Sequence, residues 1–195
     1  MAGVPPLNKT DLPQFKEQFD HYEATRGFLP NSILTMARRP EIARVFMEMN
    51  RVVLYEGSVP EELKMLVSLI SSQASGCRYC QAHMGNLAAI CGNSSERIEN
   101  LWDFETSELF SDAERAALRL SMHAGMVPNQ VRPADFDELH RHFSDEEIVE
   151  LVATISLFGY LNRWNDTMGT QLEELPAQRA FELLGSRGWE PGKHR

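Results

Sequence analysis

The sequence predicts an all-α protein, and three observations support this fold class. Apolar residues recur every three or four positions along most of the 195 residues, and no segment alternates between apolar and polar residues as a half-buried strand does. Capping boxes and prolines mark helix starts, and glycines mark helix ends. Hydrophobic residues make up 43% of the chain and charged residues 24%, which is typical of a globular protein and excludes a disordered or collagen-like chain.

The first helices follow from signals near the N-terminus. Asp11 is placed to cap a helix over residues 12–25 that ends at Gly27. Pro40 separates a short helix after Asn31 from a longer amphipathic one, because proline fits the first turn of a helix but disrupts its interior.

Three capping boxes predict later helix starts. In this motif the serine side chain accepts a hydrogen bond from the amide three residues on, and the glutamate side chain accepts one from the serine amide. The boxes read Ser58-Val-Pro-Glu61, Ser111-Asp-Ala-Glu114 and Ser144-Asp-Glu-Glu147. We expect them to open helices over residues 61–74, 112–124 and 145–163.

An internal repeat indicates two related halves. At a constant offset of 85, residues 61–71 align with residues 146–156, and Cys77-Arg-Tyr-Cys80 then falls over Asn162-Arg-Trp-Asn165. We predict one domain over residues 1–185, with a first half at about 25–105 and a degenerate second half at about 110–175 that has lost the thiols. Residues 186–195 contain two glycines, a proline and mixed charge, and are expected to form a flexible, frayed tail.

The charge balance limits the possible partners. Nineteen Lys and Arg against 28 Asp and Glu give a formal net charge of −9, which repels nucleic acids and anionic membranes over most of the surface. The most apolar stretch is shorter than the roughly 20 residues that span a bilayer, and the N-terminus lacks the pattern of a secretion signal. Three cysteines, an odd and small number, suit a reducing compartment. We therefore expect a cytoplasmic protein that binds neither nucleic acid nor membrane.

The candidate reactive residues lie in the segment Ser75-Gly-Cys77-Arg-Tyr-Cys80-Gln-Ala-His83. Gly76 interrupts the preceding helix, so Cys77 falls at the start of a helix running to about residue 90, where backbone amides and the helix dipole favour a thiolate. Cys80 and His83 follow at successive turns on the same face. Two thiols within disulfide reach beside an imidazole predict a redox dithiol.

Other interpretations of this segment remain open. Cysteine is among the most buried residue types, so the pair can be packing residues. A zinc site would combine Cys77, Cys80 and His83 with a fourth ligand from one of three distant histidines (His123, His140 or His142), but the second ligand pair of structural zinc sites is missing. A thioredoxin-like site requires a βαβ context, which the pattern does not provide.

The same segment resembles the alkylhydroperoxidase D-like (AhpD-like) proteins of the carboxymuconolactone decarboxylase superfamily. The resemblance covers about residues 25–175 and is most specific from Leu63 to His83, while residues 158–167 resemble the second half of longer members. It implies an AhpD-like helical bundle, oligomers from dimers to hexamers, and thiol-dependent reduction of hydroperoxides. It further implies that Cys80 attacks the peroxide, that Cys77 resolves the intermediate, and that a lipoyl or thioredoxin-like dithiol protein supplies electrons.

Two positions depart from the family pattern. The best-studied members place the relay histidine four residues after the second cysteine, where this chain has Met84 and offers His83 instead. Their proton-relay glutamate stands twelve residues before the first cysteine, where this chain has Met65. The repeat aligns Met65 with Glu150, so we hypothesise that Glu150 reaches the thiols from the second half. Glu62, one turn before Met65, is the alternative base.

The sequence thus predicts a peroxiredoxin-like peroxidase that reduces organic hydroperoxides through a CxxC dithiol cycle, without a metal or organic cofactor. The expected site consists of Cys77, Cys80, His83 and Glu150, while Tyr79 either joins the proton relay or packs in the core. One alternative is a carboxymuconolactone-decarboxylase-type lyase acting on a small lactone acid, which the scarcity of cationic residues disfavours. Another is a non-catalytic redox sensor or oligomeric scaffold.

Overall fold

The computed structural model describes residues 2–195. These residues form ten α-helices and five short 3-10 turns, and this part of the chain contains no strand, which confirms the predicted all-α fold class. The helices are α1 (Lys16–Arg26), α2 (Asn31–Met36), α3 (Pro40–Tyr55), α4 (Glu61–Ser75), α5 (Arg78–Ile90), α6 (Ser95–Glu99), α7 (Asp112–Gly125), α8 (Pro133–Leu139), α9 (Asp145–Met168) and α10 (Glu174–Leu184). Helices α6, α8 and α10 were not predicted from the sequence.

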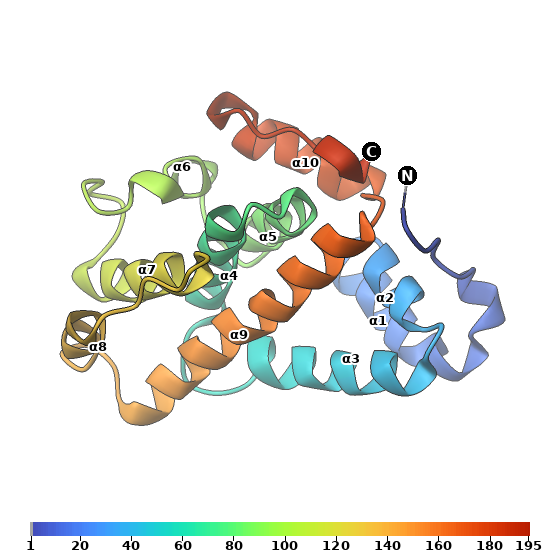
Figure 1. Ribbon diagram of the computed structural model, residues 1–195, viewed down its shortest axis with the longest axis horizontal. Helices are drawn as coiled ribbons and strands as arrows, with labels where there is room; N and C mark the ends of the chain where they lie inside the picture. The colour runs from blue at the N-terminus through green and yellow to red at the C-terminus, as the bar shows by residue number, and fades with distance from the viewer. Residues whose placement is uncertain (1) are drawn as a thin grey trace.

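Helix α4 forms the centre of the bundle, packed against α5, α7 and α9 (Figure 1). Every residue from Leu63 to Ser72 is buried, as expected for a helix that has neighbours on all sides. In Figure 1 the long helix α9 crosses in front of α4, α3 runs along the lower edge, and α10 lies over α5. Helix α5, which carries the Cys-x-x-Cys segment, is therefore enclosed by α4, α9 and α10.

Two of the three predicted capping boxes are confirmed. Ser111 and Ser144 cap α7 and α9 with both hydrogen bonds of the motif. The helix expected from the third box is confirmed, since α4 begins at Glu61, but the box itself is wrong, because Pro60 is the N-cap residue and no side chain caps that helix. The amide and hydroxyl of Ser58 instead donate to the Glu150 carboxylate, at 2.8 and 3.1 Å. A carboxylate from α9 thus binds the serine that the capping-box motif places at the start of α4.

The start of α1 differs from the prediction at Asp11. Residues 9–11 and 13–15 form two 3-10 turns, the second with Pro13 at its first position, and α1 begins only at Lys16. The predicted end of this helix is confirmed, since Gly27 follows it with a left-handed φ of 81°. Pro40 opens α3 after the short helix α2, also as predicted.

The segments related by the predicted repeat differ in their continuity. Helix α9 runs unbroken to Met168, past its predicted end at residue 163. In the first half, Gly76 adopts a φ of 78°, which ends α4 and lets α5 begin anew at Arg78. The break creates a second helix N-terminus in the middle of the bundle, and the first cysteine lies there.

The C-terminal segment packs against the bundle, so the expected frayed tail at residues 186–195 is a wrong prediction. Trp189 is 3% exposed and its indole Nε1 donates to the carbonyl of Arg78 at 3.3 Å. His194 is 1% exposed, and its carbonyl accepts a hydrogen bond from the amide of Leu172 at 2.8 Å. The glycine and proline content suggested a tail, but the aromatic side chains bury enough apolar surface to order it.

Candidate active site

The two cysteines of the motif lie at the N-terminus of α5, with Cys77 as its N-cap residue. The Cys77 Sγ accepts a hydrogen bond from the amide of Cys80 at 3.4 Å. Both thiols are free and buried, with exposed fractions of 0% and 2%. This geometry brings the thiols next to each other at the positive end of a helix dipole.

Burial dominates the acidity of the second thiol. It raises the pKa of Cys80 well above its usual value, and the neighbouring Cys77 raises it further. The side-chain amide of Asn165 opposes this by donating to the Cys80 Sγ at 3.5 Å. The Cys80 thiol is therefore held in its protonated form in this state, and its reaction requires a base to remove the proton.

His83, one turn beyond Cys80 on α5, pairs with a glutamate that the sequence analysis did not select. Its Nε2 lies 2.7 Å from Glu173 Oε2, just before the start of α10. Burial by itself would raise the pKa of Glu173, but the positive charge and hydrogen bond of His83 lower it below its usual value. Because an ionised carboxylate only accepts, His83 Nε2 is the donor in this pair, and Nδ1 is the ring nitrogen that remains to take part in proton transfer.

Tyr79 belongs to the same hydrogen-bonded group. Its hydroxyl donates to Glu173 Oε1 at 2.8 Å and accepts from the Ser32 amide at 3.4 Å. Its ring stacks on the His83 imidazole, with centroids 4.2 Å apart and planes at 26°. The Asn31 amide also donates to Glu173 Oε1. Tyr79 thus both packs and hydrogen-bonds, and it fixes the carboxylate that orients His83.

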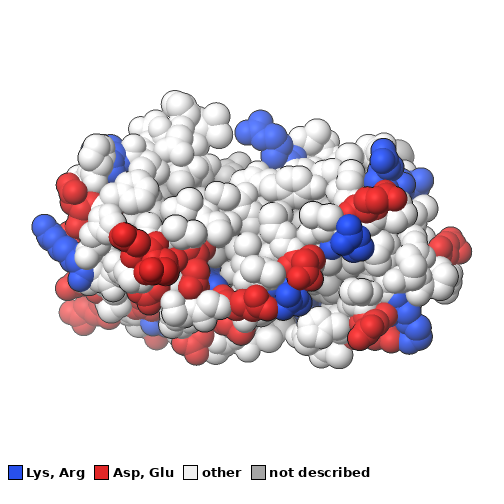
Figure 2. Space-filling model, turned by 90° about the horizontal axis from the view of Figure 1, so that it is seen from below, with Lys and Arg blue, Asp and Glu red and all other residues white. Residues whose placement is uncertain are grey.

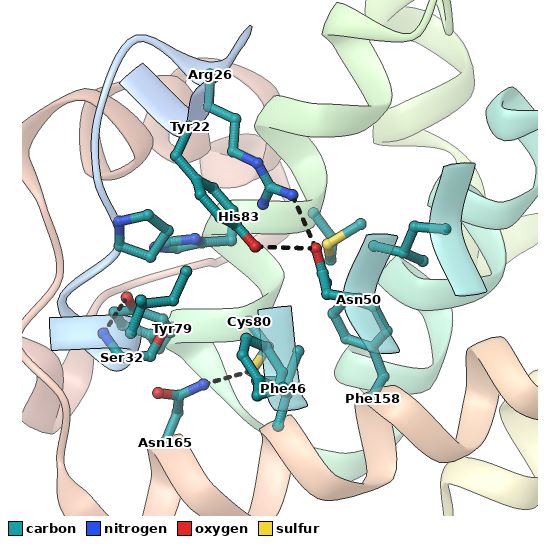
Figure 3. Close-up of a pocket in the computed structure, with 15 residues that line it drawn as sticks. Tyr22, Arg26, Ser32, Phe46, Asn50, Tyr79, Cys80, His83, Phe158 and Asn165 are labelled. Atoms are coloured by element: carbon teal, nitrogen blue, oxygen red, sulfur yellow. Dashed lines mark hydrogen bonds between the residues drawn. The ribbon is translucent and has the colours of Figure 1, made fainter. Parts of the chain in front are cut away.

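A cavity of about 40 Å³ opens beside Cys80 and His83, which is room for one or two water molecules (Figure 3). Residues from α1, α2, α3, α5 and α9 surround it. They are Tyr22, Arg26, Pro30, Ser32, Ile33, Phe46, Asn50, Leu54, Tyr79, Met84, Phe158, Leu161 and Asn165, besides the cysteine and the histidine. Aromatic and apolar side chains form most of the wall, which is typical of a site for a small organic molecule.

The predicted base Glu150 does not reach the thiols. Its carboxylate accepts hydrogen bonds from the amides of Ser58 and Val59 and pairs with Lys64 Nζ at 3.0 Å. Burial opposes ionisation, but these donors lower the pKa of Glu150 to about 2. Glu150 lies 15 residues before Asn165 on α9, so the two are separated by about 22 Å along the helix axis. Glu150 connects α9 to the loop before α4 and is not part of the cavity.

The alternative base Glu62 is also remote from the cavity. It lies in the exposed first turn of α4, where its carbonyl accepts a hydrogen bond from Asn93 Nδ2 at 3.0 Å. The family position at Met65 is fully buried in the core. The first turn of a helix favours acidic residues through the dipole, which accounts for Glu62 without a catalytic role.

Two polar residues of the site, Glu173 and Asn165, were not predicted from the sequence. Asn165 carried a signal, because the offset of 85 aligns it with Cys80, the residue that it contacts in the structure. No local sequence pattern pointed to Glu173, because it lies 90 residues from its partner His83. The alternative zinc ligand His123 is engaged elsewhere, with its Nδ1 3.0 Å from Asp135.

Residues 2–195 provide neither a cluster of metal ligands nor a membrane-spanning helix. No group of three or more His, Cys, Asp or Glu side chains in this range is arranged to hold a metal ion. No helix in the same range has the length and apolar character needed to cross a bilayer.

The fold and the site together define a class of protein: a helical bundle in which a buried Cys-x-x-Cys pair opens a helix beside a small cavity. Residues 40–121 match the carboxymuconolactone decarboxylase family. The chain is also 30% identical over 180 residues to the uncharacterised protein YnjA of Escherichia coli (strain K12), a match that covers 90% of this chain and 94% of YnjA. The protein belongs to the carboxymuconolactone decarboxylase family, and its fold is AhpD-like.

Two solved structures share nearly the whole fold. A cysteine-to-alanine variant of the debrominase Bmp8, in complex with 2,3,4-tribromopyrrole, is 36% identical with a TM-score of 0.87, covering 92% of this chain and 96% of Bmp8. The AhpD-core, peroxidase-related protein of Ralstonia eutropha JMP134 is 23% identical with a TM-score of 0.79, covering 90% of this chain and 94% of that protein. At this lower identity the second likeness shows the fold alone.

Proposed function

We propose that the protein is a thiol-dependent peroxidase that reduces small organic hydroperoxides, with Cys80 as the attacking thiol and Cys77 as the resolving thiol. One observation carries the proposal. A pair of adjacent buried thiols opens α5 beside a cavity that is also lined by His83, and His83 is held by the ionised Glu173. A nucleophile, a base and a group that orients the base are the three parts that thiol catalysis needs.

The first chemical step forms a sulfenic acid. His83 accepts the proton of the Cys80 thiol, and the sulfur attacks the terminal peroxide oxygen while the O–O bond breaks. Cys80 becomes S–OH, and the leaving alkoxide takes the proton from His83 to become an alcohol. In the second step the Cys77 sulfur attacks the Cys80 sulfur, water leaves, and a disulfide forms. An external dithiol then reduces the disulfide by thiol exchange.

The polar atoms of the cavity fit a hydroperoxide. The Asn165 Oδ1 atom is buried and has no hydrogen-bond donor among residues 2–195. A buried acceptor without a donor is costly, and the O–H of a hydroperoxide would satisfy it. At about 40 Å³, the cavity accommodates the peroxide group and leaves the rest of the substrate outside.

The proposal includes two protein partners and a compartment. One partner is a lipoyl or thioredoxin-like dithiol protein, and the other is a second copy of the chain. Side chains of α3 and α9 leave an apolar face that includes Val45 at 54% exposed and Tyr160 at 38%. In Figure 2 a largely uncharged area lies across the upper middle of the view, above a row of acidic and basic groups. Tyr160 stacks on the cavity residue Phe46, so a second copy docked there would also cover this side of the site. Free thiols suit the reducing cytoplasm.

The test is a count of free thiols by alkylation and mass spectrometry before and after one equivalent of cumene hydroperoxide. The parent should lose two thiols as a Cys77 to Cys80 disulfide. Cys80→Ser should lose none at Cys77, and Cys77→Ser should accumulate a sulfenic acid at Cys80. Cys91→Ser is the matched control, since Cys91 does not line the cavity, and it should behave as the parent does. Unchanged thiols in the parent would refute the proposal.

A second candidate function is the reductive removal of a halogen from a small aromatic ring. The 36% identity to a debrominase over 92% of the chain favours it. The same two thiols would supply two electrons: the carbon–halogen bond is replaced by a carbon–hydrogen bond, halide leaves, and Cys77 and Cys80 become a disulfide. Bromide release from brominated pyrroles in the presence of dithiothreitol would establish this activity. Bromide release with no reaction toward hydroperoxides would replace the first candidate.

Two further alternatives make different predictions about the thiols. A lyase acting on a lactone acid has no need of paired thiols, so full alkylation of both cysteines would leave its turnover intact. A redox sensor would form the disulfide once but would show no steady-state turnover with a regenerating dithiol. Unlike these two alternatives, the peroxidase requires both disulfide formation and repeated turnover.

A further inference from the structure

Arg26 carries a buried positive charge that the proposed chemistry does not use. The residue lies in the last turn of α1, is 8% exposed, and lines the cavity with Cys80. Within residues 2–195, its guanidinium has no Asp or Glu oxygen within 4.0 Å. An ion taken out of water without a countercharge is costly, and proteins normally pair it.

Neutral groups hold the guanidinium in place. Its Nη2 donates to Asn50 Oδ1 at 3.2 Å and to the Tyr55 hydroxyl at 2.7 Å. Its carbon lies 4.6 Å from the centroid of the Tyr22 ring, in cation–π geometry. Tyr22 in turn donates to Asn50 at 3.2 Å. These contacts orient the charge but do not neutralise it, and Nε and Nη1 have no hydrogen-bond acceptor within the described residues.

Arg26 lies between the cavity and a larger outer hollow. The hollow has a volume of about 450 Å³, and Tyr22, Arg26 and Asn50 line both spaces. Figure 3 shows these three side chains together at the cavity, joined through Asn50. The outer hollow also contains Arg44, which is exposed to solvent, and Arg51, whose charge is already paired with Glu48 and Glu56. A ligand that enters from the hollow therefore meets the unpaired charge of Arg26 before it reaches the thiol.

We propose that Arg26 binds the negative charge of a small organic anion, such as a carboxylate, whose reducible atom lies a few bonds away and reaches the Cys80 sulfur. This inference rests on the proposed function and deepens it by naming the substrate class. The free Nε–H and Nη1–H groups can each donate one charge-assisted hydrogen bond to a carboxylate oxygen. The net charge of −9 suggested few cationic residues for an anionic substrate. Arg26 supplies such a residue at the cavity itself.

The test compares two alkylating reagents of the same size. Iodoacetate carries a carboxylate next to its reactive carbon, whereas iodoacetamide is neutral, and both transfer their carbon to a thiolate with release of iodide. Rate constants for Cys80 are measured by mass spectrometry for the native protein and for the chain denatured in urea. Relative to the denatured chain, the native ratio of iodoacetate to iodoacetamide rates should be raised roughly 10- to 100-fold, the range for hydrogen bonds to a charged group. The ratio cancels any change in the acidity of the thiol.

Three variants localise the effect. Arg26→Gln should return the ratio to that of the denatured chain, and Arg26→Lys should retain part of the preference. Arg44→Gln is the matched control, because Arg44 is exposed and lines only the outer hollow, and it should keep the parent ratio. The comparison of native and denatured parent needs no variant, so it holds even where Arg26→Gln does not fold.

Several results would overturn the inference. They are a native ratio no higher than the denatured one, a preference that survives in folded Arg26→Gln, an equal loss in Arg44→Gln, or a native Cys80 that reacts with neither reagent. The assay uses no hydroperoxide. A protein that prefers iodoacetate but leaves hydroperoxides unreduced would refute the peroxidase and retain the anion site, whereas a peroxidase without the preference would refute only the anion site.

Discussion

Replacing Glu173 with glutamine tests whether its charge orients His83. Glutamine keeps an oxygen that can accept from Tyr79 and Asn31, as Glu173 Oε1 does. It replaces the other oxygen, 2.7 Å from His83 Nε2, with an amide that donates. Two donors then face each other, so the imidazole must take its other tautomer or turn away. The change therefore acts on the base and leaves most of the local packing in place.

The magnitude follows from the bond that is lost. A hydrogen bond of 2.7 Å between a histidine and an ionised carboxylate is of the charge-assisted kind, and such a bond contributes about 1.5–3 kcal/mol. At about 1.4 kcal/mol for each factor of ten, the rate constant for Cys80 oxidation should fall roughly 10- to 100-fold. The pH at which the rate rises should also move, because the proton-accepting atom of His83 changes.

The assay is stopped-flow oxidation of the reduced protein by cumene hydroperoxide across a pH series. Glu174→Gln is the matched control, since this neighbouring residue is exposed and forms no salt bridge within residues 2–195. It should reproduce the parent curve. A Glu173→Gln variant with the parent rate and the parent pH profile would refute the role of this carboxylate as the positioning residue.

Three further predictions concern other parts of the molecule. Glu150→Gln should leave thiol oxidation unchanged but lower the free energy of unfolding by about 3 kcal/mol, because Lys64, 1% exposed, loses its partner. Folding lowers the pKa of Glu150 from 4.5 to about 2, so the parent is more stable than the variant only while this carboxylate is ionised. The difference in unfolding free energy, measured by urea titration, should therefore be full above pH 4.5 and vanish as the pH falls toward about 2. Asn165→Ala should raise the pKa of Cys80 further, measured by the pH dependence of alkylation, and an unchanged profile would contradict the role of the amide. Val45→Glu should convert an oligomer into a monomer in light scattering, and a parent that is already monomeric would refute the docking face.

Local chemistry made much of the fold predictable. Ser111 and Ser144 define their helix starts through hydrogen bonds that span only three residues, so the sequence pattern contains the whole interaction. Gly76 is similar, because a left-handed φ is needed where α4 ends, and glycine adopts it at low cost. Cys77 at the N-terminus of α5 followed directly from that break. Ser58 shows where local patterns fail, because its amide and hydroxyl donate to the distant Glu150 carboxylate instead of forming the capping box.

The polar part of the site depends on contacts between distant segments. His83 requires a carboxylate, but its choice of Glu173 over Glu150 depends on how α10 packs against α5, which no local pattern records. The burial of Arg26 could not be predicted from local sequence either. An arginine in the last turn of a helix normally interacts with the negative end of the helix dipole and remains exposed to water. The raised pKa of Cys80 has the same origin, since burial is a property of the assembled bundle.

The contact between Asn165 and Cys80 also decides which disulfides the protein can form. Both residues of the second segment that align with the dithiol are asparagines, Asn162 and Asn165, and both are buried. If both asparagines were cysteines, four thiols would face one another. Four thiols can form disulfides in three different pairings, and they would also provide the four sulfur ligands of a tetrahedral zinc site. An amide on one side leaves Cys80 a single nearby thiol, Cys77. In the proposed cycle, oxidation thus ends in the Cys77 to Cys80 cross-link only, and every turn returns to the same starting state.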